Sequence, residues 1–193
     1  GLGCARRGVP RALSLRQMAK AKSVRQVKNM KHPMLSSDGF IVNQSCACDA
    51  PYGKYASAHN GCGWMAAYNV LHALRGQNDW QAVCDALHGG LHFGGRLGTG
   101  PRRLQRYLAS FGLCAKMGFT SYGILKKSAQ CKAGILLYFT PHGAHYVAFL
   151  PTQTAKTYRF FNAESGNENH LQTLPQFCKT QCQFPVILGI FML

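Results

Sequence analysis

Residues 133–162 read AGILLYFTPHGAHYVAFLPTQTAKTYRFFN. This stretch decides the fold class, because β-branched and aromatic residues crowd three segments, 133–140, 145–150 and 157–162, and turn-forming residues separate them. Strands joined by such short connections are antiparallel neighbours. We therefore predict an antiparallel sheet, with a further strand at 186–192, where apolar residues again predominate.

Helical patterns lie on the N-terminal side of these strands. A helix is predicted over 62–75, because apolar residues recur there at i, i+3, i+4 and i+7 and Gly76 is a typical stop. Another is predicted over 78–87 with Asn78 as its N-cap, and Pro101 opens a third. Helices followed by antiparallel strands indicate an α+β fold, with an N-terminal helical part packed on a C-terminal antiparallel β-sheet.

The positive charge of the chain is concentrated at one end. Residues 1–34 hold nine of the 22 Lys and Arg and no acid, whereas the other 159 residues hold 13 basic and six acidic side chains. We interpret 1–34 as a basic N-terminal arm that is solvated, and 35–193 as the folded domain. Alternative roles for the arm are binding an anionic partner, covering the active site as a pro-segment, or lying on a membrane surface.

Composition restricts the class of protein further. No apolar run approaches the ~20 residues that span a bilayer, so no membrane span is expected. The basic arm lacks an apolar signal segment, which favours the cytoplasm and leaves secretion open. Nucleic-acid binding has support only from the arm, which lacks interleaved aromatic residues for base stacking.

The sequence NGCGWMAA at residues 60–67 places Cys62 between two glycines where a loop becomes a helix. Unpaired N–H groups at a helix start stabilise a thiolate, and the N–H of the nucleophile itself can face a developing oxyanion. The flanking glycines would leave room for a substrate backbone. Cys62 is therefore the candidate nucleophile among nine cysteines.

A thiolate nucleophile needs a base, and two residues on the predicted strands fit that need. His145 starts one apolar strand and Asn162 ends the next, so antiparallel pairing can set them side by side. Asn162 Oδ1 could accept from one ring nitrogen while the other ring nitrogen faces Cys62. His142 is a rival base, but its place in a turn beside Pro141 favours a solvated side chain.

The chain order Cys, His, Asn resembles that of papain-like cysteine peptidases. The resemblance is to the branch of bacteriocin-leader (double-glycine) peptidases and covers roughly residues 40–191. The matching pieces are Gln44, Pro51-Tyr52-Gly53, Gly61-Cys62-Gly63, Gly98-Thr99-Gly100-Pro101, Ala144-His145-Tyr146-Val147 and Asn162. Trp64-Met65 departs from the branch, where Pro or smaller residues follow Cys-Gly.

This resemblance implies a papain-like fold and a cysteine peptidase that cleaves a peptide or amide bond through a thioacyl intermediate on Cys62. It implies a catalytic set of Cys62, His145 and Asn162, with Gln44 donating its side-chain amide to the oxyanion. Asn60 and Asn43 are the local competitors for that last role. The expected partner is a peptide or protein substrate. The alternatives are an acyl transferase or deamidase with the same residues, or a peptide-binding module without catalysis.

The remaining cysteines predict no cofactor or metal. Cys46-x-Cys48 and the pair Cys178 and Cys182 could together hold zinc or form disulfides, but neither pair has the usual Cys-x-x-Cys spacing. Free thiols are therefore the favoured interpretation, and the cofactor and metal expectation for this chain is none.

Overall fold

The computed structural model describes residues 32–193 apart from 90, 142, 164–165 and 183–187. The predicted arm, residues 1–34, falls almost entirely outside the described residues, as does the rival base His142. Residues Pro33–Leu193 form one compact unit. No helix in the described part of the chain is long and apolar enough to cross a membrane.

A six-stranded antiparallel sheet organises the described residues, in the order β3-β8-β4-β5-β6-β7. The strands are β3 (Ala115–Gly118), β4 (Ala133–Thr140), β5 (Gly143–Pro151), β6 (Thr157–Phe161), β7 (His170–Thr173) and β8 (Leu188–Met192). The predicted meander of three strands is confirmed as β4, β5 and β6, and the C-terminal strand as β8. A separate two-stranded ribbon pairs β1 (Pro51–Tyr52) with β2 (Tyr55–Ala56).

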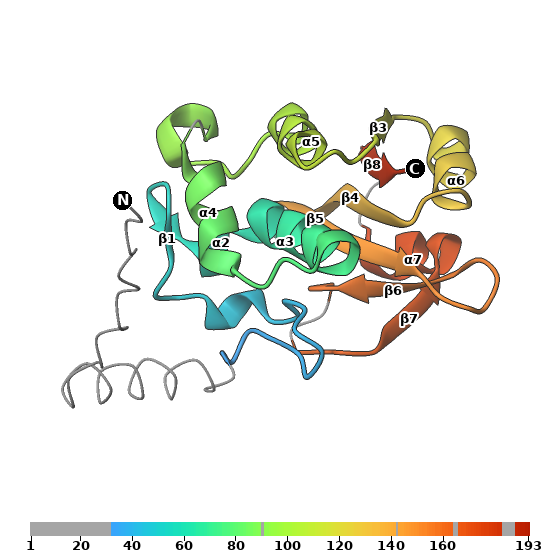
Figure 1. Cartoon of the computed structure of the whole chain (residues 1–193), viewed down its shortest axis with the longest axis horizontal. Coiled ribbons are helices and arrows are strands. Elements are labelled where there is room, and N and C mark those ends of the chain that lie inside the picture. The colour runs from blue at the N-terminus through green and yellow to red at the C-terminus, as the bar shows by residue number, and fades with distance from the viewer. Residues whose placement is uncertain (1–31, 90, 142, 164–165, 183–187) are drawn as a thin grey trace, which may run out of the picture. The chain divides into compact units, whose positions relative to one another are not determined.

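Helices cover both faces of the sheet (Figure 1). They are α2 (Ser57–Asn60), α3 (Cys62–Arg75), α4 (Trp80–His88), α5 (Pro101–Ser110), α6 (Ser121–Ser128) and α7 (Leu174–Gln181), with short 3₁₀ turns η1 (Gln44–Cys46) and η2 (His92–Gly95). The α+β prediction, with helices packed on an antiparallel sheet, is therefore confirmed. The predicted N-cap Asn78 is wrong, because Asp79 instead accepts from the N–H of Ala82 at 3.0 Å.

The strands β4 and β5 are almost wholly apolar because successive side chains point to opposite faces of the sheet and both faces are buried. Ile135 and Ala148 face the core under α3, whereas Leu136 and Phe149 face a second core beneath α6 and α7. A strand buried on both faces has no polar side chains to alternate with apolar ones. The central hairpin is thereby fixed from two sides, which makes it a rigid base for a site.

The segment of residues 34–44, here called the strap, contacts both α3 and the sheet. Asn69 on α3 accepts from the N–H of Ile41 at 2.7 Å and donates to its carbonyl at 2.9 Å. Further along, Met34 is fully buried and its carbonyl accepts from the N–H of Val42. These hydrogen bonds fix the direction in which the strap leads into η1, and they thereby position Gln44.

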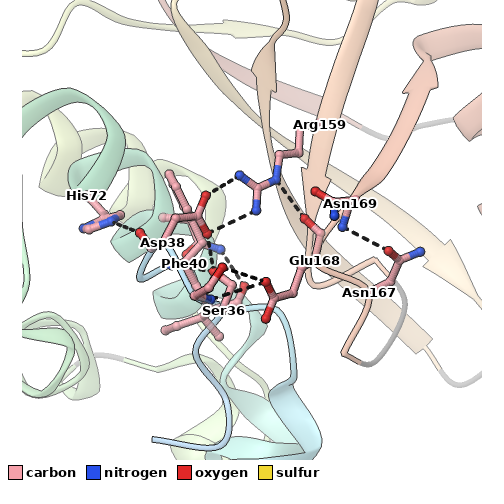
Figure 2. A network of polar contacts seen from close by, with 11 residues as sticks. Ser36, Asp38, Phe40, His72, Arg159, Asn167, Glu168 and Asn169 are labelled. Atoms are coloured by element: carbon pink, nitrogen blue, oxygen red, sulfur yellow. Dashed lines mark hydrogen bonds and ion pairs between the residues drawn. The ribbon is translucent and has the colours of Figure 1, made fainter. Parts of the chain in front are cut away.

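Figure 2 shows the polar network that anchors the strap to the sheet. Arg159 on β6 forms a two-pronged ion pair with Asp38, and its Nε donates to the carbonyl of Glu168 at 2.8 Å. The guanidinium also lies over the rings of Phe40 and Phe161, 5.3 and 4.7 Å from their centroids. Because Phe161 directly precedes Asn162, this network holds the end of β6 against the strap.

Candidate active site

Cys62 is the first residue of α3, and its side chain is only 9% exposed. The adjoining glycines are required by the protein itself. A Cβ on Gly61 would lie 2.5 Å from the carbonyl oxygen of Ser57, and one on Gly63 would lie 3.1 Å from Thr99. Close packing is therefore one reason for these glycines, and room for a substrate backbone stays a prediction.

The environment of Cys62 favours a thiolate. Its Sγ accepts hydrogen bonds from the backbone N–H groups of Gly63 and Tyr146, and it is hydrogen-bonded to the His145 side chain. Burial acts to raise the pKa of this thiol, but the hydrogen bond and positive charge of His145 outweigh burial and hold the pKa below its ordinary value. Cys62 and His145 are thus near enough to shift each other's pKa.

The imidazole of His145 has partners on both sides. Its Nε2 lies 2.9 Å from the backbone carbonyl oxygen of Asn162, which leaves Nδ1 for the thiol. Burial lowers the pKa of His145, but the Cys62 contact and the carbonyl raise it above its ordinary value overall. Shifts in these opposite directions are the ones that stabilise the charged form of each group, thiolate on Cys62 and imidazolium on His145. Tyr138 on β4 is the cross-strand partner of His145, and its ring meets the imidazole edge-on with 5.6 Å between the ring centroids.

Asn162 contacts the imidazole through a different atom from the one predicted. Its Oδ1 accepts from the backbone N–H of Gln44 at 2.9 Å, and its Nδ2 donates to Gln44 Oε1 at 3.0 Å. Asn162 also adopts the left-handed conformation, with φ of +65°. With its side chain engaged by the strap, Asn162 orients His145 through the main chain, and the predicted bond from the ring to Oδ1 is wrong.

Gln44 reaches the site, as predicted, but its amide is engaged on the cleft wall. Nε2 donates to the carbonyl oxygens of Ser57 at 3.2 Å and Ala58 at 3.1 Å. Its local competitor Asn60 is buried and donates to the carbonyls of Tyr52 and Gly95, so it holds loops together. The other competitor, Asn43, accepts from the hydroxyl of Ser45 and is absent from the cleft lining.

A cleft of about 660 Å³ opens over these side chains. Its lining comes from η1 and α2, from residues 96–101, and from β4 and β5. The hydroxyls of Tyr52 and Thr99 share a short hydrogen bond that fixes the 96–101 loop. Cys62, His145, Gln44 and Asn162 all line this cleft, so the four predicted residues are brought together in one place.

Sequence reasoning missed the contribution of Tyr138 and Tyr146. Both line the cleft, one with its ring against His145 and the other with its backbone N–H on Cys62. The signal for Tyr138 was available in principle. Once the turn between β4 and β5 is placed at residues 141–142, strand register sets Tyr138 opposite His145.

The other described cysteines are free thiols. Cys178 and Cys182, one helical turn apart at the end of α7, are hydrogen-bonded to each other. Cys48 donates to the carbonyl of Ser45. Within the described ranges, no group of three or more His, Cys, Asp or Glu side chains is placed to hold a metal ion.

Comparison with known proteins gives no family for this chain. No protein-family model matches its sequence, and a search of curated proteins gives no significant match. The site must therefore be interpreted from its own geometry.

Proposed function

We propose that this protein is a cysteine hydrolase that cleaves a peptide or amide bond through a thioacyl intermediate on Cys62. The observation that carries the proposal is the buried thiol in contact with an imidazole at the base of a cleft. A structural cysteine needs neither the imidazole nor two backbone N–H donors on its sulfur. The fold, the order Cys, His, Asn, and the resemblance to papain-like peptidases of the bacteriocin-leader branch support the same assignment.

The proposed reaction has two steps. In the first step, the Cys62 thiolate attacks the substrate carbonyl carbon, and the imidazolium of His145 gives its Nδ1 proton to the leaving amine as the C–N bond breaks. In the second step, neutral His145 takes a proton from water, which attacks the thioester carbonyl. The C–S bond then breaks, which releases the acid and restores the thiolate. The Asn162 carbonyl keeps the ring in the plane that serves both transfers.

The tetrahedral intermediates place negative charge on the former carbonyl oxygen. The N–H of Cys62 at the start of α3 is one donor for that oxygen. Gln44 is the proposed second donor, since it lines the cleft and its Nε2 carries two protons. For that role, Nε2 would exchange one of its contacts with the Ser57 and Ala58 carbonyls for the substrate oxygen.

The experiment is to incubate the full chain with a proteome-derived peptide library and identify the products by mass spectrometry. We expect cleavage that Cys62→Ala abolishes, and an acyl adduct on the Cys62 peptide after rapid acid quench. The exposed thiols Cys48 and Cys114 supply matched controls, since their replacement by Ala should leave cleavage unchanged. Cleavage that survives in Cys62→Ala would refute the proposal. Transfer of the acyl group to an added amine, without hydrolysis, would identify a transferase instead.

A further inference from the structure

The described lining of the cleft carries positive charge without any carboxylate. Its ionisable side chains are His59, Cys62, Arg96, Tyr138, His145 and Tyr146. Cys62 and His145 add no net charge as a pair, whether the proton lies on the sulfur or on the ring, and the tyrosines stay neutral because burial raises the pKa of each hydroxyl. Arg96 therefore supplies the net charge of the described lining, because a guanidinium is always protonated.

The acidic side chains that the structure describes all lie outside this lining. Asp38 and Glu168 belong to the Arg159 network of Figure 2, and Asp79 caps α4. Asp85 accepts from Gln81 on α4, and Asp49 lies outside the lining residues. Glu164, the remaining acid of the sequence, lies outside the described residues. None of the described carboxylates therefore forms an ion pair with Arg96. The ion pair found among the described residues joins Arg159 to Asp38.

The loop that carries Arg96 lines the cleft and is held in place by its neighbours. The carbonyl of Gly95 accepts from the N–H of Lys54 at 2.9 Å, and a Cβ on Gly53 would lie 2.5 Å from that same oxygen. Phe93 and Leu97 on either side of Arg96 are 77% and 54% exposed. An exposed cation next in sequence to an exposed apolar side chain, with both in the cleft lining, is suited to bind an extended chain that carries a negative charge.

We infer that the substrate carries a carboxylate within a few residues of the cleaved bond, and that Arg96 binds it as the specificity-determining residue of the cleft. The position of the carboxylate relative to a cleaved bond rests on the proposed function. Recognition of a carboxylate by Arg96 does not depend on it. Because Arg96 is exposed, the effect is moderate. A single screened charge pair changes kcat/KM by roughly three- to tenfold, and a like charge on the substrate has the opposite effect.

The test uses the same proteome-derived peptide library on the wild-type chain, Arg96→Gln and Arg96→Glu. We expect Asp and Glu to be enriched at least about threefold at one position beside the wild-type cleavage sites. Arg96→Gln should remove the enrichment, and Arg96→Glu should shift it to Lys and Arg. Arg102→Gln is the matched control, since Arg102 is an exposed neighbour outside the lining and should leave the preference intact. Enrichment that persists in Arg96→Gln, or no charge preference at all, overturns the inference.

A side-chain carboxylate and a free C-terminal carboxylate are separated by comparing peptide acids with peptide amides of the same sequence. Binding to immobilised Cys62→Ala protein then separates this inference from the proposed function. Retention of acidic peptides that Arg96→Gln abolishes supports the inference even without cleavage by the wild-type chain. Cleavage that depends on Cys62 but ignores substrate charge refutes only the inference.

Discussion

The imidazole of His145 lies between a thiol and a main-chain carbonyl, and the amide of Asn162 belongs to a different part of the site. Two hydrogen bonds join that amide to Gln44, one to its backbone and one to its side chain. The Asn162 side chain is therefore a positioning group for Gln44. The orientation of His145 depends on the carbonyl of residue 162, which any residue provides if it tolerates a φ of +65°.

Replacing Asn162 by Gly tests this division of roles. Gly keeps the carbonyl and adopts positive φ without strain, so the pH dependence of kcat should stay unchanged. The value of kcat itself should fall by no more than in Gln44→Ala, because Asn162→Gly removes contacts that position Gln44 and leaves its amide in place. The double variant should be no worse than Gln44→Ala alone. A displaced pH profile in Asn162→Gly would show that the side chain acts on the imidazole after all.

Gln44→Ala tests the oxyanion donor directly. Loss of one such donor typically lowers kcat by ~10²–10³ with little change in KM. Asn60→Ala should instead lower the thermal unfolding temperature, because Asn60 is buried and joins the Tyr52 and Gly95 carbonyls. Steady-state kinetics and thermal melts on both variants check the contrast. A larger kcat loss in Asn60→Ala than in Gln44→Ala would reverse the assignment.

At the residue scale, the sequence was sufficient to predict that Cys62 and His145 line the same site. It was insufficient to predict which atom of Asn162 contacts the imidazole. Cys62 and His145 could be predicted because glycine neighbours, a helix start and a strand position each restrict where those residues lie. The bond from His145 to the Asn162 carbonyl depends on the φ of one residue and on a strap that approaches from 118 positions earlier in the sequence. Local patterns do not specify such long-range contacts.

At the scale of elements, the strap is held by the Arg159–Asp38 ion pair, and this pair makes stability depend on pH. The Arg159 guanidinium lowers the pKa of Asp38 from 3.8 to about 2. A lowered carboxyl pKa stabilises the fold above the unfolded value, and that contribution is lost as pH falls from about 4 toward 2. Both side chains are partly exposed, so solvent screening limits the stabilisation to about 1 kcal/mol.

Asp38→Asn should therefore lower the free energy of unfolding by about 1 kcal/mol at neutral pH and by much less near pH 2. Urea unfolding across this pH range measures the difference. Asp85→Asn is the control, since Asp85 lies exposed on α4 and its recorded bond is to Gln81. A destabilisation by Asp38→Asn that stays constant down to pH 2 would show that the ion pair is not its origin.

The bounds of α7 are among the features that the sequence analysis did not predict. Its start carries a capping box in which Thr173 accepts from the N–H of Gln176 and the Gln176 side chain reaches back to Thr173, with Pro175 in the first turn. That signal was present in the sequence. The neighbouring β-rich segments outweighed it, whereas α3 was predicted because its apolar stripe is longer and ends at a left-handed glycine.

At the scale of the whole molecule, one core closes under α3 and a second under α6 and α7, both within Pro33–Leu193. The strap contributes to the first core through Met34, which is fully buried. We therefore predict that a chain beginning at Pro33 keeps the thermal unfolding temperature of the full chain. A chain beginning at Ser37 should lose roughly 2–5 kcal/mol, as expected when a large buried side chain is removed. Equal melting of the two shortened chains would contradict this placement of Met34.

The most direct test of the central claim is the rate at which iodoacetamide alkylates each cysteine as a function of pH, followed by peptide mass mapping. The thiolate–imidazolium pair predicts that Cys62 reacts faster than the exposed thiols Cys48 and Cys114 at about pH 6. Its midpoint should lie below the ordinary thiol value of 9.0 and rise in His145→Ala, since the imidazole lowers the pKa of this buried thiol. If Cys62 instead reacts no faster than Cys48 and Cys114, with a midpoint that His145→Ala leaves unchanged, then Cys62 is a structural cysteine and the proposed hydrolase is wrong.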